Sequence, residues 1–483
     1  MTAFYHWLTL ALVGFYWVIV AAVSLRIVLK RRPFGVSLAW LLLIYIIPLF
    51  GVIVYLLFGE INIGRNRRKR VKVMTPQFRQ WYQQLSSSGS PLGPLARPIH
   101  ELSIRRLGIP ALCGNSMELL ENCQGILKRL IRDIEQAKDQ IHLEFYIWHP
   151  GGLADEVAEA LIDAQARGVQ VRVLLDGAGS RDFFASNWPA KFNDADIELV
   201  KALGVNPLRM FLRRMDLRQH RKIIVIDQKV AYTGSMNLVD SRHFKQSSGV
   251  GEWIDVMVRM TGPAVWPLYA QQCWDWQYET GDSLLKEVTP LPEDLGASCD
   301  NGHSVQVIPS GQGLPENLIQ QVLLSNIYHA RKSIILTSPY FVPSEQLVDA
   351  LCTAAQSGVD VKVVVPDKND SFMAEWASRA FFAELLRSGV KLYRFSGGLL
   401  HTKSLLIDDA HCIIGTVNLD IRSLLLNSEV SLAIDEPEFC QRLQQLLDGY
   451  LQQSHQLDGV RWKQRPVWQK LIEQFFYTFA PLL

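Results

Sequence analysis

Two stretches decide the fold of this 483-residue chain: HRKIIVID at residues 220–227 and HTKSLLID at residues 401–408. Each is followed after six residues by a Gly-hydroxyl-x-Asn group, GSMN at residues 234–237 and GTVN at residues 415–418. A single His-x-Lys on a strand is usually structural, whereas two complete copies with the same spacing are improbable by chance. The pattern therefore predicts an internal duplication.

The apolar run behind each histidine predicts a strand, on which side chains two residues apart share one face. This rule pairs histidine with lysine and hydroxyl with asparagine: His220 with Lys222, His401 with Lys403, Ser235 with Asn237, and Thr416 with Asn418. The motif aspartates, Asp227 and Asp408, stand at an odd spacing from the histidines. We expect them to point away from the histidines and to be structural rather than catalytic.

A histidine, a lysine and a hydroxyl–amide pair on one surface suit phosphoryl transfer. An imidazole can attack phosphorus or carry a proton, while ammonium and amide groups bind the non-bridging oxygens as charge moves in the transition state. The two histidines are 401 − 220 = 181 residues apart. They can meet only if the duplicated halves face each other across a pseudo-twofold axis, which would place one histidine on each side of one phosphorus.

The sequence around the motifs repeats in the same order, with a strand, a helix and a second strand in each half. The matching segments are 141–146, 157–164 and 169–175 in the first half, and 333–340, 347–351 and 359–365 in the second. This order predicts βαβ units in an α/β fold, with a parallel-leaning sheet covered by helices. Segments 86–98 and 289–304 are rich in Ser, Gly and Pro and predict linkers.

The amino-terminal region contains two uncharged stretches. No side chain between Tyr5 and Leu25 carries a full charge, and a helix of that length spans about 30 Å of hydrocarbon. The second stretch covers residues 34–58, after a turn with four basic residues. We expect a two-helix transmembrane hairpin rather than a cleaved signal peptide or a pair of buried core helices.

The charges around the expected hairpin favour a cytoplasmic body. Six basic residues between positions 65 and 72 follow the second stretch, against four in the turn, and the positive-inside bias is weak for a large domain. This basic run is either solvated or in contact with anionic lipid headgroups. The seven cysteines show no Cys-x-x-Cys spacing, so free thiols are favoured over metal ligands, and free thiols favour a reducing compartment.

The overall composition excludes several classes of protein. Lys+Arg number 49 and Asp+Glu 47, a balance that gives no broad positive field for a nucleic acid. A hydrophobic content of 48% is too high for a disordered chain. The chain is therefore expected to be a folded, membrane-attached protein that does not bind nucleic acid.

The duplicated HxKxxxxDxxxxxxG[ST]xN pattern resembles the phospholipase D superfamily, from about residue 115 to about residue 453. The hairpin, PYFVP at residues 339–343, GGLL at residues 397–400 and PLL at residues 481–483 resemble more narrowly the bacterial cardiolipin synthases of the A-type. The resemblance implies two α/β/α-sandwich repeats with one shared active site. It also implies a two-step transfer without metal or cofactor, through a phosphatidyl-histidine intermediate, in which two phosphatidylglycerols give cardiolipin and glycerol.

The resemblance also implies roles for individual residues. His220 and His401 would be the nucleophile and the general acid/base, and analogy with superfamily members favours His220 as the nucleophile. The groups expected to hold the phosphoryl oxygens are Lys222, Lys403, Ser235, Asn237, Thr416 and Asn418. The family orients each histidine with a carboxylate. Glu429 fits this role in the second half, and Asp255 fits it in the first, with Glu252 as a rival.

The expected domains are a transmembrane hairpin over 1–60, a basic segment and linker over 61–98, a first phospholipase-D-like repeat over 99–288, a linker over 289–304, a second repeat over 305–460 and an apolar C-terminal segment over 461–483. Residues 208–218 interleave arginines with apolar residues, and they form either an interfacial segment or an ordinary amphipathic surface element. The apolar residues 467–483 lie on the bilayer or pack on the body, and packing is slightly favoured.

Three functions fit these features. The favoured one is a phosphatidyltransferase that acts on phosphatidylglycerol in a bacterial inner membrane, with several membrane crossings. The second is a hydrolase of the same superfamily, either a phospholipase or a nuclease. The third is a membrane protein without activity, which two complete motifs argue against.

Overall fold

The computed structural model describes residues 2–30, 34–60, 63–85, 92–204, 216–285 and 303–479. It divides into two compact units, one with residues 1–66 and 205–216 and the other with residues 67–204 and 217–483. Most of the arginine-rich segment 208–218 and of the linker 289–304 lies outside the described residues.

The smaller unit contains three apolar helices, α1 (Thr2–Leu29), α2 (Phe34–Ile46) and α3 (Pro48–Phe58). The sequence predicted one helix over residues 34–58, but the helix breaks at Pro48, which has no N–H to donate and disfavours helical geometry at the preceding Ile47. With 13 and 11 residues, α2 and α3 are each shorter than a bilayer core of about 30 Å requires. Among the described helices, only α1 is long and apolar enough to cross a membrane.

The three helices pack on one another around a small apolar cluster. Its buried members are Val20, Val23, Ile27, Ile44, Val52 and Tyr55. Glu60, which follows α3, forms ion pairs with Arg26 at 2.6 Å and with Lys30 at 2.7 Å. The chain thus returns, after α3, to the carboxyl end of α1.

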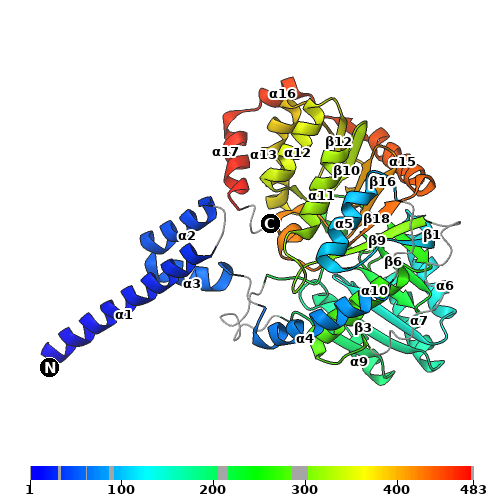
Figure 1. The fold of residues 1–483 in the computed structure, drawn as a ribbon, viewed down its shortest axis with the longest axis horizontal. Coiled ribbons are helices and arrows are strands. Elements are labelled where there is room, and N and C mark those ends of the chain that lie inside the picture. The colour runs from blue at the N-terminus through cyan, green and yellow to red at the C-terminus, as the bar shows by residue number, and fades with distance from the viewer. Residues whose placement is uncertain are drawn as a thin grey trace. The chain divides into compact units, whose positions relative to one another are not determined.

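The larger unit is built on a mixed sheet to which both repeats contribute (Figure 1). The strands of the first repeat are β1 (Leu112–Leu120), β2 (Gln140–Phe145), β3 (Gln170–Asp176), β4 (Glu198–Ala202), β5 (Ile223–Ile226), β6 (Val230–Gly234) and β8 (Met257–Thr261). Those of the second are β9 (His303–Ser310), β10 (Ser333–Thr337), β12 (Asp360–Pro366), β13 (Lys391–Phe395), β15 (Ser404–Ile407), β16 (His411–Gly415), β18 (Glu429–Asp435) and β19 (Ser454–Gln456).

The strand order shows the duplication directly. Across the sheet it is β4-β3-β2-β5-β6-β8-β1 in the first repeat and β13-β12-β10-β15-β16-β18-β9 in the second, with β1 next to β9 and β19 beyond β13. The predicted βαβ units are present, but among the described strands of this large sheet parallel pairing is limited to β2-β3-β4 and β10-β12-β13. The expected parallel-leaning sheet is wrong, because the motif strands form the antiparallel hairpins β5-β6 and β15-β16.

Helices cover both faces of the sheet. In the first repeat, Ile141, Leu143 and Phe145 of β2 pack with α6 (Cys123–Glu135) and α7 (Leu153–Ala166). His142 alternates to the other face, where its ring lies 5.0 Å from that of Tyr269 in α10 (Val265–Thr280). The helices of the second repeat are α11 (Leu318–His329), α12 (Glu345–Gln356), α13 (Phe372–Arg387) and α15 (Pro437–Gln452).

The basic segment after the apolar helices is itself helical and packs on this body. It forms α4 (Arg65–Tyr82), which is followed by α5 (Ala96–Leu107). Arg70 donates hydrogen bonds to the carbonyls of residues 278–280 at the end of α10, and Arg67 pairs with Glu279 at 2.6 Å. Arg70 thus caps a helix whose terminal carbonyls lack partners within the helix, and Arg67 holds an acidic side chain of its last turn.

The cysteines differ from expectation at one position. Cys113 is disulfide-bonded, whereas the free thiols among the described residues are Cys123, Cys273, Cys352, Cys412 and Cys440, all of them buried. The expectation that every cysteine is unpaired is therefore wrong. Because one cysteine is disulfide-bonded, the cysteines do not support the inference of a reducing compartment.

The C-terminal segment both packs on the body and exposes an apolar face. It contains α16 (Gly459–Lys463) and α17 (Val467–Tyr477). One side of α17 lies against α13, where Glu473 is buried and pairs with Arg465 and Arg379. The other side exposes Val467, Trp468, Leu471 and Phe475.

The motif glycines, Gly234 and Gly415, end β6 and β16 where the neighbouring strand leaves no room for a side chain. A Cβ atom on Gly234 would overlap the carbonyl oxygen of Val256, and one on Gly415 would overlap that of Val430. Neither glycine has a positive φ, so close approach of the backbones explains both.

We expect Gly415→Ala to lower the free energy of unfolding by about 1–3 kcal/mol, the usual cost of overpacking. The matched control is Gly449→Ala in α15, where a Cβ meets nothing within 4 Å. Thermal unfolding of the full chain in detergent compares the two variants. Equal unfolding temperatures would show that the strands can move apart without cost.

Candidate active site

A cavity of about 410 Å³ lies between the two repeats, and both motif histidines line it. Each histidine lies just before a motif strand and is fixed by main-chain contacts with the other repeat. The His220 N–H donates to the Ser428 carbonyl, and the His401 N–H donates to the Ile254 carbonyl, both at 2.9 Å. The short strands β7 (Trp253–Ile254) and β14 (Leu399–Leu400) pair in parallel beside the second contact. The duplicated halves therefore bring together residues 181 positions apart (401 − 220).

A carboxylate from the opposite repeat holds each histidine ring. His220 Nδ1 lies 2.8 Å from Glu429 Oε2, and His401 Nδ1 lies 2.6 Å from Asp255 Oδ1. The contacts therefore cross between the repeats. Because Nδ1 is engaged, Nε2 is the ring nitrogen of each histidine left to react. The rival carboxylate Glu252 contacts neither ring in the described contacts and accepts a hydrogen bond from Ser241 at 3.0 Å.

The motif hydroxyls lie behind the carboxylates instead of lining the cavity. Ser235 Oγ donates to Asp255, and Thr416 Oγ1 donates to Glu429, both at 2.5 Å. Each oxygen also accepts a main-chain N–H at 2.9 Å. Both hydroxyls thus hold the carboxylates, and their expected contact with phosphoryl oxygens stays a prediction.

The motif lysines are buried beside the histidines. Lys222 Nζ donates to the His220 carbonyl at 2.7 Å, and Lys403 Nζ donates to the His401 carbonyl at 2.6 Å. Burial lowers the pKa of Lys222 to about 8 and the pKa of Lys403 to about 7. An anionic phosphate nearby would favour the charged form of both groups.

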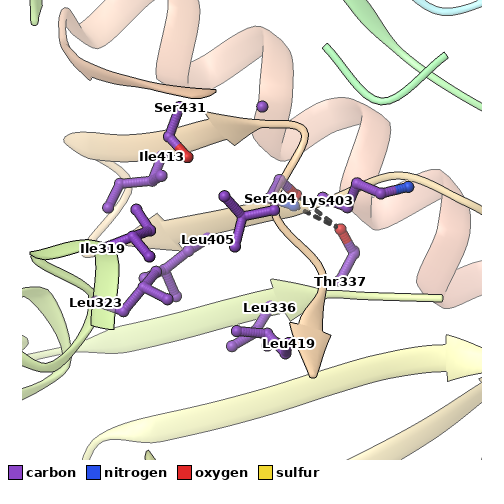
Figure 2. Close-up of a pocket in the computed structure, with 12 residues that line it drawn as sticks. Ile319, Leu323, Leu336, Thr337, Lys403, Ser404, Leu405, Ile413, Leu419 and Ser431 are labelled. Atoms are coloured by element: carbon purple, nitrogen blue, oxygen red, sulfur yellow. Dashed lines mark hydrogen bonds between the residues drawn. The ribbon is translucent and has the colours of Figure 1, made fainter. Parts of the chain in front are cut away.

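Asn237 and Asn418 line the same cavity as the histidines. The carbonyl oxygen of the Asn237 side chain accepts the Ile147 N–H at 3.3 Å, which leaves its NH₂ group for other acceptors. A second, smaller cavity of about 20 Å³ lies beside β15 and has room for only about one water molecule. Figure 2 shows the Lys403 ammonium directed away from the apolar side chains that line this cavity.

The two histidine–carboxylate pairs are electrostatically unequal. Burial raises the pKa of Glu429 to about 7. Burial opposes ionisation of Asp255 too, but the charge of His401 and its hydrogen bond hold the pKa of Asp255 below its usual range. Burial lowers the pKa of His401 to about 4, and burial with Lys222 and Lys403 lowers the pKa of His220 well below its usual value. His401 therefore has the more strongly anionic partner.

Comparison with known families agrees with this duplicated site. A family model described as "Cardiolipin synthase, PLD-like domain" matches residues 130–248 and again residues 323–451. Cardiolipin synthase A of Yersinia pseudotuberculosis serotype O:1b (strain IP 31758) is 51% identical over 490 residues, which cover 100% of each chain. The chain belongs to the cardiolipin synthase family of the phospholipase D superfamily.

Other relatives extend this picture. Cardiolipin synthase A of Yersinia pestis is also 51% identical, with 100% of both chains covered. A model described as "Phospholipase_D-nuclease N-terminal" matches residues 17–60, which include most of the apolar helices. Among solved structures, phosphatidylserine synthase of Haemophilus influenzae Rd KW20 covers 80% of this chain and 98% of its own, with a TM-score of 0.58 and 17% identity. That similarity shows the fold.

The motif aspartates lie away from the cavity of this cardiolipin synthase family member. Asp227 accepts the main-chain N–H groups of residues 138–140, and Asp408 accepts those of residues 331–333. Both have positive φ, 51° and 52°, in the turns of the motif hairpins. Each carboxylate therefore ties a hairpin turn to the start of a neighbouring strand.

Sequence reasoning missed the aromatic residues beside the histidines. The Tyr146 ring lies 4.8 Å from that of His220, and the Trp253 ring lies 4.4 Å from that of His401. Tyr146 ends a predicted strand and Trp253 precedes Asp255 by two residues, so both stood next to recognised features. Among the described residues, no group of three or more His, Cys, Asp or Glu side chains is placed to hold a metal ion.

We expect Lys403→Met to lower the rate of cardiolipin formation by about a hundredfold or more, because a buried cation near the phosphoryl group is lost. We also expect the variant to stay folded with a lower unfolding temperature, because the buried His401 carbonyl loses its donor and the nearby carboxylates lose a compensating charge. Activity and thermal unfolding are measured on the same full-length preparation. A variant that loses both its activity and its folded structure would identify Lys403 as a structural residue.

Proposed function

We propose that the enzyme transfers a phosphatidyl group from one phosphatidylglycerol to another and releases glycerol, so that cardiolipin is formed. The observation that carries this proposal is the full-length 51% identity to relatives named cardiolipin synthase A. The cavity supports it, since two histidines from opposite repeats line one space. A hydrolase of the same superfamily would use the same residues and differ only in the attacking group.

In the first proposed step, Nε2 of His220 attacks the phosphorus of the donor lipid. The bond from phosphorus to the headgroup oxygen breaks, and protonated His401 gives its proton to that oxygen, which leaves as glycerol. A phosphatidyl group is now bound to His220, and His401 is neutral. Lys222, Lys403 and the two asparagines stabilise the charge on the phosphoryl oxygens.

In the second step, a hydroxyl of the acceptor phosphatidylglycerol gives its proton to His401 and attacks the phosphorus. The phosphorus–nitrogen bond breaks, and cardiolipin and the original enzyme form. The electrostatic difference between the pairs supports these roles. His220 stays neutral and nucleophilic, while ionised Asp255 favours protonation of His401 when a phosphodiester binds.

The apolar helix α1 indicates membrane association. We propose the inner membrane of a bacterial cell, with the body in the cytoplasm, and the six basic residues between positions 65 and 72, against four between the two apolar stretches, support that side. The multi-pass arrangement stays a prediction, because α2 and α3 are each too short to cross.

We test the reaction with purified full-length protein and phosphatidylglycerol alone. We expect equal amounts of cardiolipin and glycerol, with little phosphatidic acid, as measured by lipid chromatography and a glycerol assay. His220→Ala and His401→Ala should each lower the rate by about a thousandfold or more, because the histidines act as a unit. His455→Ala, on an exposed histidine, is the control. Predominant phosphatidic acid would assign a phospholipase instead.

The exposed face of α17 supports direct contact of the body with lipid. Its four apolar residues are 55–69% exposed. Phe372, at the start of α13, is 63% exposed and contacts Phe476 of α17 at 5.4 Å between ring centroids. Its neighbours Ser371 and Ala374 line the catalytic cavity. We propose that this face enters the bilayer surface and brings lipid headgroups to the cavity.

We expect Leu471→Glu to slow cardiolipin formation severalfold on phosphatidylglycerol vesicles, because a charge opposes entry into the bilayer. The rate with dispersed short-chain phosphatidylglycerol should not change. The control is Gln464→Glu, which adds the same charge at an exposed position before α17. A loss of rate with both substrates would point to a disturbed fold rather than to lipid contact.

A further inference from the structure

An ion pair between the two repeats lies at the rim of the catalytic cavity. Lys245 belongs to the first repeat and Asp370 to the second, and Lys245 Nζ lies 2.8 Å from Asp370 Oδ2. Lys245 lines the cavity and also begins a run of exposed residues, 245–249. On the other side of the pair, Ser371 lines the cavity and Phe372 is exposed. The pair therefore stands where the cavity meets its surroundings.

Further contacts hold both partners of this ion pair. Asp370 Oδ1 accepts the hydroxyl of Tyr340 at 2.8 Å, and Tyr340 also lines the cavity. The Asp370 side chain is only 5% exposed, so its charge depends on these two partners. Lys245 has a φ of 48°, which is uncommon for a residue other than glycine, and its carbonyl accepts the hydroxyl of Ser248 at 2.7 Å. The loop is thus bent at the residue that reaches the other repeat.

The ion pair adjoins the histidine that exchanges protons in the proposed reaction. Lys245 Nζ lies 5.3 Å from the centre of the Trp253 ring, and the Trp253 ring lies 4.4 Å from that of His401. Trp253 is buried and lines the cavity. Asp370, Lys245 and Trp253 therefore form one connected wall on the His401 side of the cavity.

We propose that the Lys245–Asp370 ion pair favours transfer over hydrolysis, because it keeps bulk water away from His401 while the phosphatidyl group is bound to His220. This inference rests on the proposed function, in which a lipid hydroxyl attacks that intermediate. In hydrolysis, water would give a proton to His401 and attack the phosphorus, the phosphorus–nitrogen bond would break, and phosphatidic acid would form. Exclusion of water from the site suppresses this side reaction.

The position of the pair suits this role. Phe372 follows Asp370 by two residues and belongs to the apolar surface that we propose enters the bilayer. A lipid acceptor reaches the cavity from that surface, whereas water reaches it through any gap between the repeats. A half-exposed ion pair contributes a factor of a few to an equilibrium, so its loss is expected to change the product ratio and not to abolish the reaction.

The test measures which nucleophile captures the intermediate. Purified full-length enzyme receives phosphatidylglycerol vesicles, and the initial rates of cardiolipin and phosphatidic acid formation are measured by lipid chromatography. Lys245→Met and Asp370→Asn should each raise the ratio of phosphatidic acid to cardiolipin by about threefold or more. Both products come from the same intermediate, so the ratio does not depend on the rate of the first step.

A double variant shows whether the two residues act as a pair. When Lys245→Met and Asp370→Asn are combined, the ratio should not exceed that of the larger single variant, because the same contact is lost in all three proteins. The matched control is Lys391→Met. Lys391 is 46% exposed, against 45% for Lys245, and pairs with Asp360 at 2.7 Å, away from the residues that line the cavity. This control should keep the parent's ratio.

The possible outcomes separate this inference from the proposed function. Unchanged ratios in both single variants, effects that multiply in the double variant, or an equal shift in Lys391→Met would each overturn the inference. Asp370→Asn keeps the shape of the side chain, so it decides the case if thermal unfolding shows that Lys245→Met does not fold. A parent that makes phosphatidic acid without cardiolipin would refute the proposed function and this inference together. A parent that makes cardiolipin, with variants that keep its ratio, would refute this inference alone.

Discussion

The crossed contact between each histidine and the carboxylate of the opposite repeat is the interaction on which the site depends. Glu429 holds His220, and Asp255 holds His401, so neither repeat contains a complete site. The contact requires that the two repeats meet across their equivalent edges, as the neighbouring strands β1 and β9 allow. The duplication of the sequence is therefore a condition of the chemistry, since one copy supplies a histidine without its orienting group.

This arrangement places many ionisable groups where burial opposes their charged forms. Lys222 and Lys403 have lowered pKa values, and Glu429 has a raised pKa, for that reason. The hydroxyls of Ser235 and Thr416 reduce the cost by donating to the carboxylates. Such groups contribute to stability only when their partners are complete. The rigid hairpins around them, tied down by Asp227 and Asp408, keep those partners in place.

Much of the fold and of the site could be predicted because the decisive signals are local. The two-residue period of a strand pairs each histidine with its lysine, and the odd spacing of Asp227 places it on the other face. The orienting carboxylates were found by resemblance, but the crossing between repeats could not be read from one sequence, because it depends on which edges of the sheet meet. The roles of Ser235 and Thr416 stayed hidden for the same reason.

Other differences arose where one residue or a tertiary contact decided the outcome. Pro48 divides a stretch whose composition alone predicts one long helix. The basic run was expected to be solvated or to meet lipid, yet Arg70 caps α10, a contact 208–210 residues away along the chain. Hydrophobic periodicity identifies elements reliably, but it does not say which distant element an arginine will reach.

The two halves of the site are similar in backbone and unequal in charge, and this inequality supports the different roles proposed for the two histidines. In the first repeat, buried Arg221 pairs with Asp275 and donates to the Glu429 carbonyl at 3.0 Å. At the matching position of the second repeat, Thr402 contacts the Tyr450 hydroxyl at 3.2 Å and brings no charge. A symmetric site would let either histidine attack or carry the proton. Unequal surroundings allow one histidine to stay neutral as a nucleophile while the other, beside an ionised carboxylate, exchanges protons with alcohol oxygens.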